Sequence, residues 1–294
     1  MGNTEKISIR FFNDREVRAV WDEENSKWWF SVLDIVGVLN EQDDYEKNRN
    51  YWKYLKAKLK KENNQLGSVT TQFKLTAPDG KKRLSNVMDY NQVIELAKKF
   101  PNNKSAPFIQ WFTYSDETID GKSKTKAYAL FESSLLESIA VGTVNGLKQI
   151  HAYLFGGLYD FAGKIRTVNI SKGGFKFAAA EFLPQTLDSI EKMPESTFDQ
   201  IAEKYVEMNI AHPFREGNGR TTRIWLDLIL KRSLKKCVDW SKINKKDYLD
   251  AMEQSVCDTS KIKFLLKNAL TDKINDREMF MKGIDYSYYY EEAE

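Results

Sequence analysis

Two segments with helical periodicity flank one short run of polar residues and glycines, and this arrangement constrains the fold more than any other feature. The run spans residues 212–223 and reads His-Pro-Phe-Arg-Glu-Gly-Asn-Gly-Arg-Thr-Thr-Arg. Apolar residues recur at helical spacing before it, over 198–210, and after it, over 224–229. Pro213 disfavours the helical conformation at His212, so the first helix is predicted to end there. The sequence therefore predicts two helices joined by this turn.

The turn has the composition of an anion-binding site. Gly217 and Gly219 permit a tight turn and allow the backbone to approach a ligand closely. The start of the second helix offers unpaired N–H groups and the positive end of the helix dipole, which suit a phosphate. Arg220 and Arg223 are three residues apart and can reach the same side of the first helical turn. Arginine forms the forked hydrogen bonds that phosphates accept well.

Two further side chains of the run are suited to chemistry. His212 is one of only 2 histidines in the chain, and its ordinary pKa is near neutrality. Glu216 supplies a hard oxygen ligand of the kind that Mg²⁺ prefers. The other histidine, His151, lies next to an apolar helical face and is expected to be a packed structural residue. The alternative for the whole run is a capped turn between helices with a surface histidine.

The run resembles the signature of the Fic family, H-P-F-x-[D/E]-G-N-G-R-x-x-R, and meets every fixed position. The resemblance implies transfer of AMP from ATP to a Ser, Thr or Tyr hydroxyl of a target protein, which is the reaction of a protein adenylyltransferase, a nucleotidyltransferase. His212 would be the general base that takes the proton from the attacking hydroxyl. Glu216 would hold the Mg²⁺ that bridges the α- and β-phosphates.

The resemblance also assigns the phosphate contacts. The amides of Gly217, Asn218 and Gly219 would form an anion-binding hole, and the side chain of Asn218 would help to place the phosphates. Arg220 and Arg223 would hold the β- and γ-phosphates. Because Fic proteins share this pocket and differ in the phosphorus attacked, removal of AMP and transfer of another phosphate-bearing group stay open.

A hairpin is predicted ahead of the signature. Residues 166–177 place β-branched residues around Lys172-Gly173-Gly174, a turn sequence typical of hairpins. This segment resembles the flap of Fic proteins, in which Lys172, Gly173, Gly174 and Phe175 would pair with the backbone of the target protein and present its hydroxyl. A plain surface hairpin is the alternative.

The chain ends in a tyrosine-rich segment that composition alone would assign to a polar, frayed terminus. The segment resembles the inhibitory helix of some Fic proteins, [S/T]-x-x-x-E-[G/N], and that helix is predicted at about 284–294. Ser287 and Glu291 match the pattern, whereas Glu292 replaces Gly or Asn. The resemblance implies that Glu291 pairs with Arg223 and makes ATP bind unproductively, so that the enzyme is autoinhibited.

A second segment has the same spacing of serine and glutamate. Ser133 and Glu137 resemble the N-terminal form of the inhibitory helix. The C-terminal segment is preferred because residues 141–290 as a whole resemble the Fic subclass whose last helix is inhibitory. In this subclass a tyrosine just after the serine can itself receive AMP, so Tyr288 is a candidate for self-modification.

Length and pattern divide the chain into two parts. A chain of 294 residues suggests one large or two modest domains. Residues 1–120 alternate short β-like runs with helical patterns, whereas residues 127–294 are mostly helical. The polar stretch 116–126 is the predicted linker. The expected fold is a mainly α Fic fold with a β-hairpin flap, preceded by a smaller α+β domain.

The N-terminal domain carries a basic, aromatic stretch at residues 45–62. Strands that include Trp28-Trp29-Phe30 come first, and a helix and this basic stretch follow. This order resembles the Bro-N type domain of phage antirepressors. The resemblance implies DNA contact through residues 53–61. A solvated helix face and a module that recruits a protein target are the alternatives. The second functional hypothesis is therefore a DNA-binding or protein-interaction regulator whose Fic half binds nucleotide without turnover.

Composition sets the remaining expectations. No run approaches eighteen apolar residues, so no membrane span is expected. The start of the chain has no signal-peptide core, and 2 cysteines fit a reduced, cytoplasmic location. A net charge of +3 is too small to indicate nucleic acid by itself. The expected partners are ATP with Mg²⁺ and a target protein, and a homo-oligomer is left open.

Overall fold

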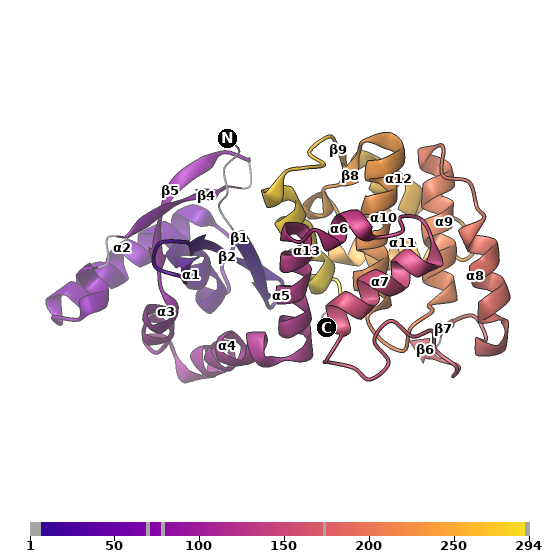
Figure 1. The fold of residues 1–294 in the computed structure, drawn as a ribbon. Helices are drawn as coiled ribbons and strands as arrows, with labels where there is room; N and C mark the ends of the chain where they lie inside the picture. The colour runs from indigo at the N-terminus through magenta and orange to yellow at the C-terminus, as the bar shows by residue number, and fades with distance from the viewer. Residues whose placement is uncertain (1–6, 69–70, 78–79, 173–174, 292–294) are drawn as a thin grey trace. The chain divides into compact units, whose positions relative to one another are not determined.

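The computed structural model describes residues 7–68, 71–77, 80–172 and 175–291. The chain divides into two compact units, Met1–Thr118 and Ile119–Glu294. The N-terminal unit contains a β-sheet and the C-terminal unit is mainly helical with a β-hairpin, which confirms the predicted fold class (Figure 1). Over the described part of the chain, no helix combines the length and apolar character needed to span a membrane.

The N-terminal unit is built on a five-stranded antiparallel sheet with the strand order β1-β2-β3-β5-β4. The strands are β1 Ile7–Phe12, β2 Arg15–Asp22, β3 Lys27–Ser31, β4 Gln72–Thr76 and β5 Lys82–Met88. Asn13 and Asp14 join β1 to β2 with φ values of 48° and 60°, a left-handed conformation that Asn and Asp tolerate. This two-residue turn matches the twist of the paired strands.

Helices and short 3-10 turns complete this unit. They are α1 Val32–Asn40, α2 Tyr45–Lys61, η1 Gln65–Ser68, α3 Tyr90–Ala97, α4 Asn102–Tyr114 and η2 Ser115–Glu117. Their apolar sides meet the sheet in one cluster that includes Phe30, Ile35, Phe108 and Phe112. Helix α2 is amphipathic: its Trp52, Leu55 and Leu59 are buried, while its basic residues cover the opposite, exposed face.

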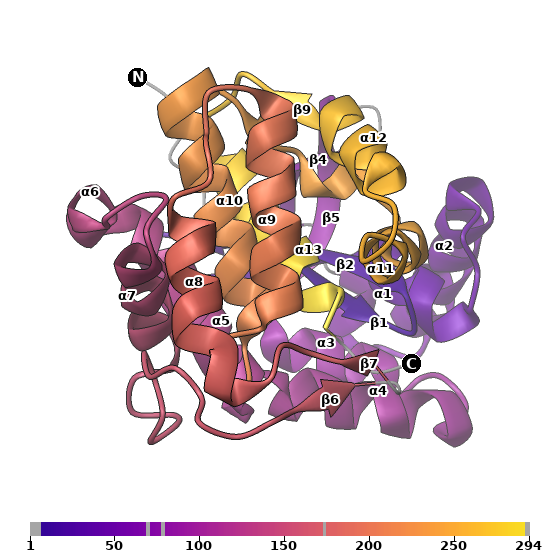
Figure 2. The same cartoon turned by 90° about the vertical axis from the view of Figure 1, so that its right-hand side faces the viewer.

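The C-terminal unit is a bundle of helices with two short two-stranded sheets (Figures 1 and 2). Its helices are α5 Ile119–Glu132, α6 Leu135–Ser138, α7 Val144–Phe155, α8 Leu183–Glu191, α9 Phe198–Ala211, α10 Asn218–Leu234, α11 Lys245–Gln254, α12 Ser260–Asn268 and α13 Arg277–Tyr289. The strands are β6 Ser171–Lys172, β7 Phe175–Lys176, β8 Cys237–Val238 and β9 Leu270–Thr271, and the 3-10 turns are η3 Ala180–Phe182 and η4 Trp240–Lys242.

Helix α10 lies at the centre of this unit and packs against α7, α9 and α13. It buries apolar residues on several sides, among them Trp225, Leu226 and Ile229. Arg220 and Arg223 in its first turns are also buried. A helix that is covered all round belongs in a core, and here its polar start is covered as well. The start of α10 is therefore enclosed by protein from several elements.

The boundary between the two units falls within the predicted linker at residues 116–126, but most of this stretch forms helix α5. The polar composition and Gly121 suggested a flexible connection. However, Ser123, Ala127 and Leu130 recur at helical spacing and are buried, and α5 packs against α13. Small and polar side chains on the buried face gave little hydrophobic periodicity, which is why the sequence concealed this helix.

The last helix, α13, begins earlier than the predicted segment 284–294 and ends before Glu291, which follows it in a turn. Asp276 caps it by accepting a hydrogen bond from the amide of Met279. The alternative of a frayed polar terminus is wrong up to Glu291, because Ile284, Ser287 and Tyr288 are buried. Residues 292–294 lie outside the described residues.

Candidate active site

The predicted turn lies between α9 and α10 and is held in place by buried groups. His212 ends α9 in a left-handed conformation with φ of 48°, and Gly217 precedes α10 with φ of 77°. Phe214 is fully buried and its ring stacks on His151, with ring centroids 3.8 Å apart. The Nε2 of His151 donates to the carbonyl of Glu216 at 2.9 Å. His151 is thus a buried structural residue that contacts and supports the turn.

The side chain of Asn218 holds the turn together. Its Oδ1 accepts from the amide of Phe214 and its Nδ2 donates to the carbonyl of Phe214, both at 2.8 Å. The side chain is buried, so these two bonds close the turn as a rigid loop. Each polar atom of its amide thus has one partner within the turn, and the placement of phosphates by this side chain stays a prediction.

His212 presents one ring nitrogen to a cavity and has the other fixed. Its Nδ1 lies 3.2 Å from the carbonyl oxygen of Asn209. A carbonyl only accepts, so the proton sits on Nδ1 and Nε2 carries the lone pair. Burial lowers the pKa of His212 to about 4, so the ring is neutral near pH 7. The ring of Phe177 stacks on the ring of His212, with ring centroids 3.7 Å apart.

The backbone behind His212 is anchored by an arginine outside the signature. Arg166 is buried and donates to the carbonyls of His212 at 2.7 Å and of Ala211 at 3.0 Å. It also donates to the carbonyls that flank the hairpin, at Val168 and Ala178. One side chain therefore fixes the histidine and the base of the hairpin together.

A cavity of about 380 Å³ opens in front of this histidine. Its size falls within the range of small-molecule sites. Signature residues form one wall, and α11 and its end supply an apolar wall with Leu249, Met252 and Val256. The signature residues that line it are His212, Arg215, Glu216, Asn218, Gly219 and Arg223. Gly217 and Arg220 do not line the cavity.

The predicted flap residues lie at the edge of the same cavity. Strands β6 and β7 pair antiparallel, with Lys172 opposite Phe175. Lys172 and Phe175 both line the cavity. The predicted turn residues Gly173 and Gly174 lie outside the described residues. The hairpin thus borders the space into which His212 faces, where an extended peptide could add to its edge.

Glu216 could bind a metal ion whose remaining coordination positions are filled by a bound ligand. Its side chain is 55% exposed, and its Oε1 accepts from the amide of Gly217 at 2.9 Å and from Arg220 at 3.0 Å. Its second carboxylate oxygen makes no hydrogen bond to any described residue. Mg²⁺ needs only one or two carboxylates when phosphates and water complete its shell, so this single exposed carboxylate fits. Within the described ranges no cluster of three or more His, Cys, Asp or Glu could hold a metal alone.

Arg223 has its N–H groups engaged by α13 and α11. Its Nε donates to Ser287 Oγ and its Nη2 to the Ser287 carbonyl, both at 2.7 Å. Nη2 also donates to Glu291 Oε1 at 2.5 Å, and Nη1 donates to the hydroxyl of Tyr248 at 3.1 Å. The guanidinium is 2% exposed, so the C-terminal segment replaces solvent around it. Sequence reasoning found Ser287 and Glu291 but missed Tyr248, which has no motif around it.

Glu291 occupies the space over the start of α10. A Cβ atom on Gly219 would collide with its Oε1, so the carboxylate lies directly above this glycine. Its Oε2 is 3.7 Å from Lys172 Nζ. Burial by itself would raise the pKa of Glu291, but Arg223 lowers it to about 2. A charged carboxylate therefore occupies the position where a helix N-terminus would otherwise favour a phosphate.

The structure places the other inhibitory candidate away from this site. Glu137 is exposed on α6, and it makes no contact with Arg220 or Arg223 in the described part of the chain. Tyr288, by contrast, is buried, and its hydroxyl donates to Ser123 Oγ at 2.9 Å. Burial raises the pKa of Tyr288, and its hydroxyl is not accessible while α13 stays in place.

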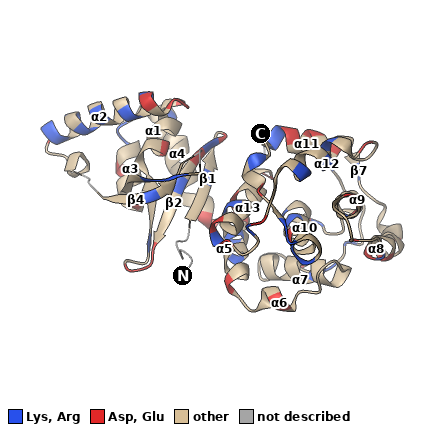
Figure 3. Cartoon of the chain, turned by 90° about the horizontal axis from the view of Figure 1, so that it is seen from above, with Lys and Arg blue, Asp and Glu red and all other residues tan. Residues whose placement is uncertain are grey.

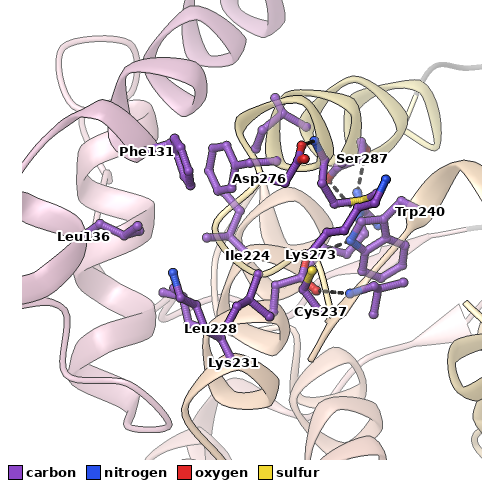
Figure 4. Close-up of a pocket in the computed structure, with 18 residues that line it drawn as sticks. Phe131, Leu136, Ile224, Leu228, Lys231, Cys237, Trp240, Lys273, Asp276 and Ser287 are labelled. Carbon is purple, nitrogen blue, oxygen red and sulfur yellow. Dashed lines mark hydrogen bonds between the residues drawn. The ribbon is translucent and has the colours of Figure 1, made fainter. Parts of the chain in front are cut away.

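A second, smaller cavity lies on the other side of α13, between this helix and α10 (Figure 4). Its volume is about 50 Å³. Phe131 and Leu136 line one side, Ile224 and Leu228 of α10 another, and Ser287 belongs to its wall as well. A void of this kind weakens packing. Helix α13 still buries Met281, Ile284 and Tyr288, so this void is a local gap in its packing.

Comparison with known proteins identifies the part of the chain that forms this site. The model of the Fic/DOC family matches residues 142–230. Protein adenylyltransferase VbhT of Bartonella schoenbuchensis is 34% identical over 154 residues, which are 47% of this chain and 32% of VbhT. The probable protein adenylyltransferase y4lH of Sinorhizobium fredii is 27% identical over 140 residues, 43% of this chain and 72% of that relative.

A solved structure also aligns with this chain. The BepC protein of Bartonella tribocorum, crystallised with bound AMPPNP, aligns with a TM-score of 0.46 at 18% identity and covers 53% of this chain and 85% of that one. The chain spans only about a third of the length of VbhT, with 32% covered. The family match starts just before α7 and ends within α10, so it includes His212 and the whole signature. Residues 142–230 of this chain, which form the site, are therefore similar to the Fic/DOC family.

Proposed function

We propose that this chain is an ATP-dependent protein adenylyltransferase that its own C-terminal segment holds inactive. The observation that carries the proposal is the cavity in front of His212, which combines a neutral base with the start of α10. Relatives of the Fic domain are named protein adenylyltransferases, which supports AMP as the group transferred.

Different residues of this chain would have different roles in such a reaction. The free Nε2 of His212 takes the proton of the target hydroxyl, and the pKa of about 4 keeps that nitrogen unprotonated at pH 7. The hydroxyl oxygen attacks the α-phosphorus of ATP, and the bond to pyrophosphate breaks. The first-turn amides of α10, with Gly219 at their centre, stabilise the negative charge on the phosphates.

Two parts of the site hold the reactants. Glu216 would bind Mg²⁺, which would neutralise phosphate charge when bound. The exposed edge of the β6–β7 hairpin would pair with the backbone of the target and bring its hydroxyl to His212. The apolar wall of Leu249, Met252 and Val256 would accommodate the nucleoside.

The proposed inhibition follows from the hydrogen bonds that Arg223 already makes to the C-terminal segment. This arginine is the natural partner of a terminal phosphate, but Ser287 and Glu291 use three of its contacts. ATP must displace the carboxylate of Glu291 or bind with its phosphates shifted away from the start of α10. Release of α13 would also expose Tyr288, which then becomes available for self-modification.

The experiment measures transfer of label from α-labelled ATP to protein, with Mg²⁺, in a cell lysate and with the pure chain. The wild type, Glu291→Gly and Glu291→Gly combined with His212→Ala are compared. We expect label on the chain or on a lysate protein only with Glu291→Gly. Glu137→Gly is the matched control, because it removes the glutamate of the other candidate segment and should leave the rate at the wild-type level.

The results separate the functional hypotheses. Loss of label in the His212→Ala background would support the base and the inhibitory segment together. Activation by Glu137→Gly instead would assign inhibition to the other segment. If ATP binds to every variant but none transfers label, the chain is a nucleotide-binding regulator. Hydrolysis of AMP from a labelled protein would indicate the reverse reaction.

The exposed face of α2 supports a second proposal, contact between the N-terminal unit and DNA. Arg49, Lys53, Lys56 and Lys60 recur at helical spacing along one stripe, and Figure 3 shows blue turns along α2. Tyr54 is 65% exposed on the same helix. A row of cations with an aromatic side chain suits a phosphate backbone.

A mobility assay with duplex DNA at low salt tests this second proposal. Lys53→Glu combined with Lys60→Glu reverses two charges of the stripe and should abolish the shift. Lys261→Glu with Lys267→Glu, on α12, makes the same charge change elsewhere and is the control. An unchanged shift in the α2 variant, or no shift for the wild type at low salt, would leave α2 as a solvated helix face or a protein-recruiting surface.

A further inference from the structure

Arg220 is as deeply buried as Arg223, but its acidic partner comes from another helix. Its Nη1 donates to the carboxylate of Asp120 in the first turn of α5, and its Nη2 donates to Glu216 at 3.0 Å. Its guanidinium lies between two rings, 5.1 Å from the centroid of Phe155 and 5.3 Å from that of Tyr288. These groups separate Arg220 from the cavity in front of His212.

One N–H of Arg220 has no partner. Its Nε is buried and makes no hydrogen bond to any described residue. Buried polar groups in folded proteins are nearly always paired, so an unpaired donor on a signature arginine points to a ligand oxygen as its missing partner. Displacement of Tyr288 would uncover one face of this guanidinium and give a phosphate access to it.

The carboxylate of Asp120 is easy to displace. Its side chain is 60% exposed, whereas the Arg220 side chain is 3% exposed. An exposed carboxylate can return to water with little desolvation cost, so this ion pair is weak compared with a fully buried pair. A phosphate carries more charge than a carboxylate and would take its place on Arg220.

Helices α5 and α13 form an antiparallel pair, which brings Asp120 and Glu291 to the same end. Lys124 pairs with the buried Asp285 at 2.7 Å. Further along, the rings of Phe131 and Phe280 stack with centroids 4.5 Å apart. The same pair includes the hydrogen bond between Tyr288 and Ser123. The N-terminal end of α5 and the C-terminal end of α13 therefore each direct one carboxylate at one signature arginine.

We infer that Asp120 is a second inhibitory carboxylate, which withholds Arg220 from the nucleotide phosphates as Glu291 withholds Arg223. The inference rests on the proposed function, because it assumes that a nucleotide competes for these arginines. It makes the inhibitory unit a helix pair, α5 with α13, rather than a single helix. Removal of Glu291 alone would then free one of the two arginines and leave the site partly inhibited.

The test measures binding by calorimetry, so it does not depend on turnover. Asp120→Asn is made in the Glu291→Gly background, and dissociation constants are measured for ATP, pyrophosphate and adenosine. We expect binding of ATP and pyrophosphate to tighten about threefold to fivefold, the range of an exposed ion pair, and adenosine binding to stay the same. Asp188→Asn is the matched control, because it removes an exposed carboxylate of the same unit that pairs only with Lys192.

A coupling experiment shows whether the effect acts through Arg220. The gain from Asp120→Asn should vanish when Arg220→Gln is also present, because the removed carboxylate then has no arginine to release. For labelled transfer we expect a lower KM for ATP with an unchanged kcat. Asp120→Ser replaces Asp120→Asn if the latter unfolds.

The outcomes distinguish this inference from the proposed function. If Glu291→Gly transfers AMP but Asp120→Asn leaves ATP and pyrophosphate binding unchanged, the inference falls and the proposed function stands. Weaker binding would show that Asp120 positions Arg220 for the nucleotide, which also overturns it. A gain that persists with Arg220→Gln would be a general charge effect and counts against it. If no variant binds ATP, the proposed function fails and the inference fails with it.

Discussion

Replacing Glu291 with glutamine separates the charge of this side chain from its bulk. Glutamine has nearly the shape of glutamate but cannot form an ion pair. Arg223 lowers the pKa of Glu291 from 4.5 to about 2, against the opposing effect of burial. At about 1.36 kcal/mol for each unit, and with a discount because the side chain is 22% exposed, the charge holds the segment on Arg223 by about 2 to 3 kcal/mol.

The sign of this effect fixes the conditions of the assay. Because the pKa of Glu291 is lowered in the attached state, its contribution is fully present above pH 4.5 and is lost only as the pH falls through about 2. The attachment of the C-terminal segment should therefore not change between pH 6 and pH 8. At pH 7.5, Glu291→Gln should raise the rate of label transfer from α-labelled ATP by about 30- to 150-fold.

Two companion variants complete the experiment. Glu291→Asp keeps the charge on a shorter side chain and should give an intermediate rate, because the 2.5 Å contact with Arg223 cannot form in the same geometry. Glu291→Gly also removes the bulk above Gly219 and should match or exceed Glu291→Gln. If Glu291→Gln behaves as the wild type while Glu291→Gly is active, bulk rather than charge blocks the site and the electrostatic reasoning is refuted.

Other predictions concern the elements that support the site. Asn218→Ala should lower the free energy of unfolding by about 2 to 4 kcal/mol in a denaturant titration, because it leaves both polar groups of Phe214 unpaired. Burial lowers the pKa of His151 from 6.5 to about 4, so its contribution to stability should be full above pH 6.5 and fall by about 2 kcal/mol at pH 5, beside a similar contribution from His212. His151→Gln should remove about half of that pH dependence, and an equal slope in both proteins would refute the assignment.

The sequence predicted the elements whose signals are local. Pro213 after His212 marked the end of α9, and the glycines of the signature marked the start of α10. The N-terminal part also contains the expected short strands, and the basic stretch at residues 45–62 forms helix α2. Each of these predictions rests on residues within one or two turns of one another, where chain geometry alone decides the outcome.

The sequence failed where tertiary packing outweighed composition. The polar stretch 116–126 was taken as a linker because Ser123 and Gly121 lower its helical signal, yet contact with α13 makes it helical. The start of α13 at Arg277 was also missed, because the pattern that marked this segment begins only at Ser287 and the first turn of the helix is only partly buried. Buried surface from a distant segment supplies the stability that local propensity lacks.

By itself, the sequence determined that His212 and Glu216 lie on a turn and that Arg220 and Arg223 lie in the first turns of the next helix, because these residues are neighbours in the chain. Only the tertiary structure decided which acid meets which arginine. Glu291 is 68 residues from Arg223 and Asp120 is 100 residues from Arg220. Helical spacing determines which way neighbouring side chains point within a few turns. It cannot determine how two helices that are far apart in the sequence align with each other. That register comes from the packing of α13 against both α5 and α10, and it places a carboxylate on each arginine.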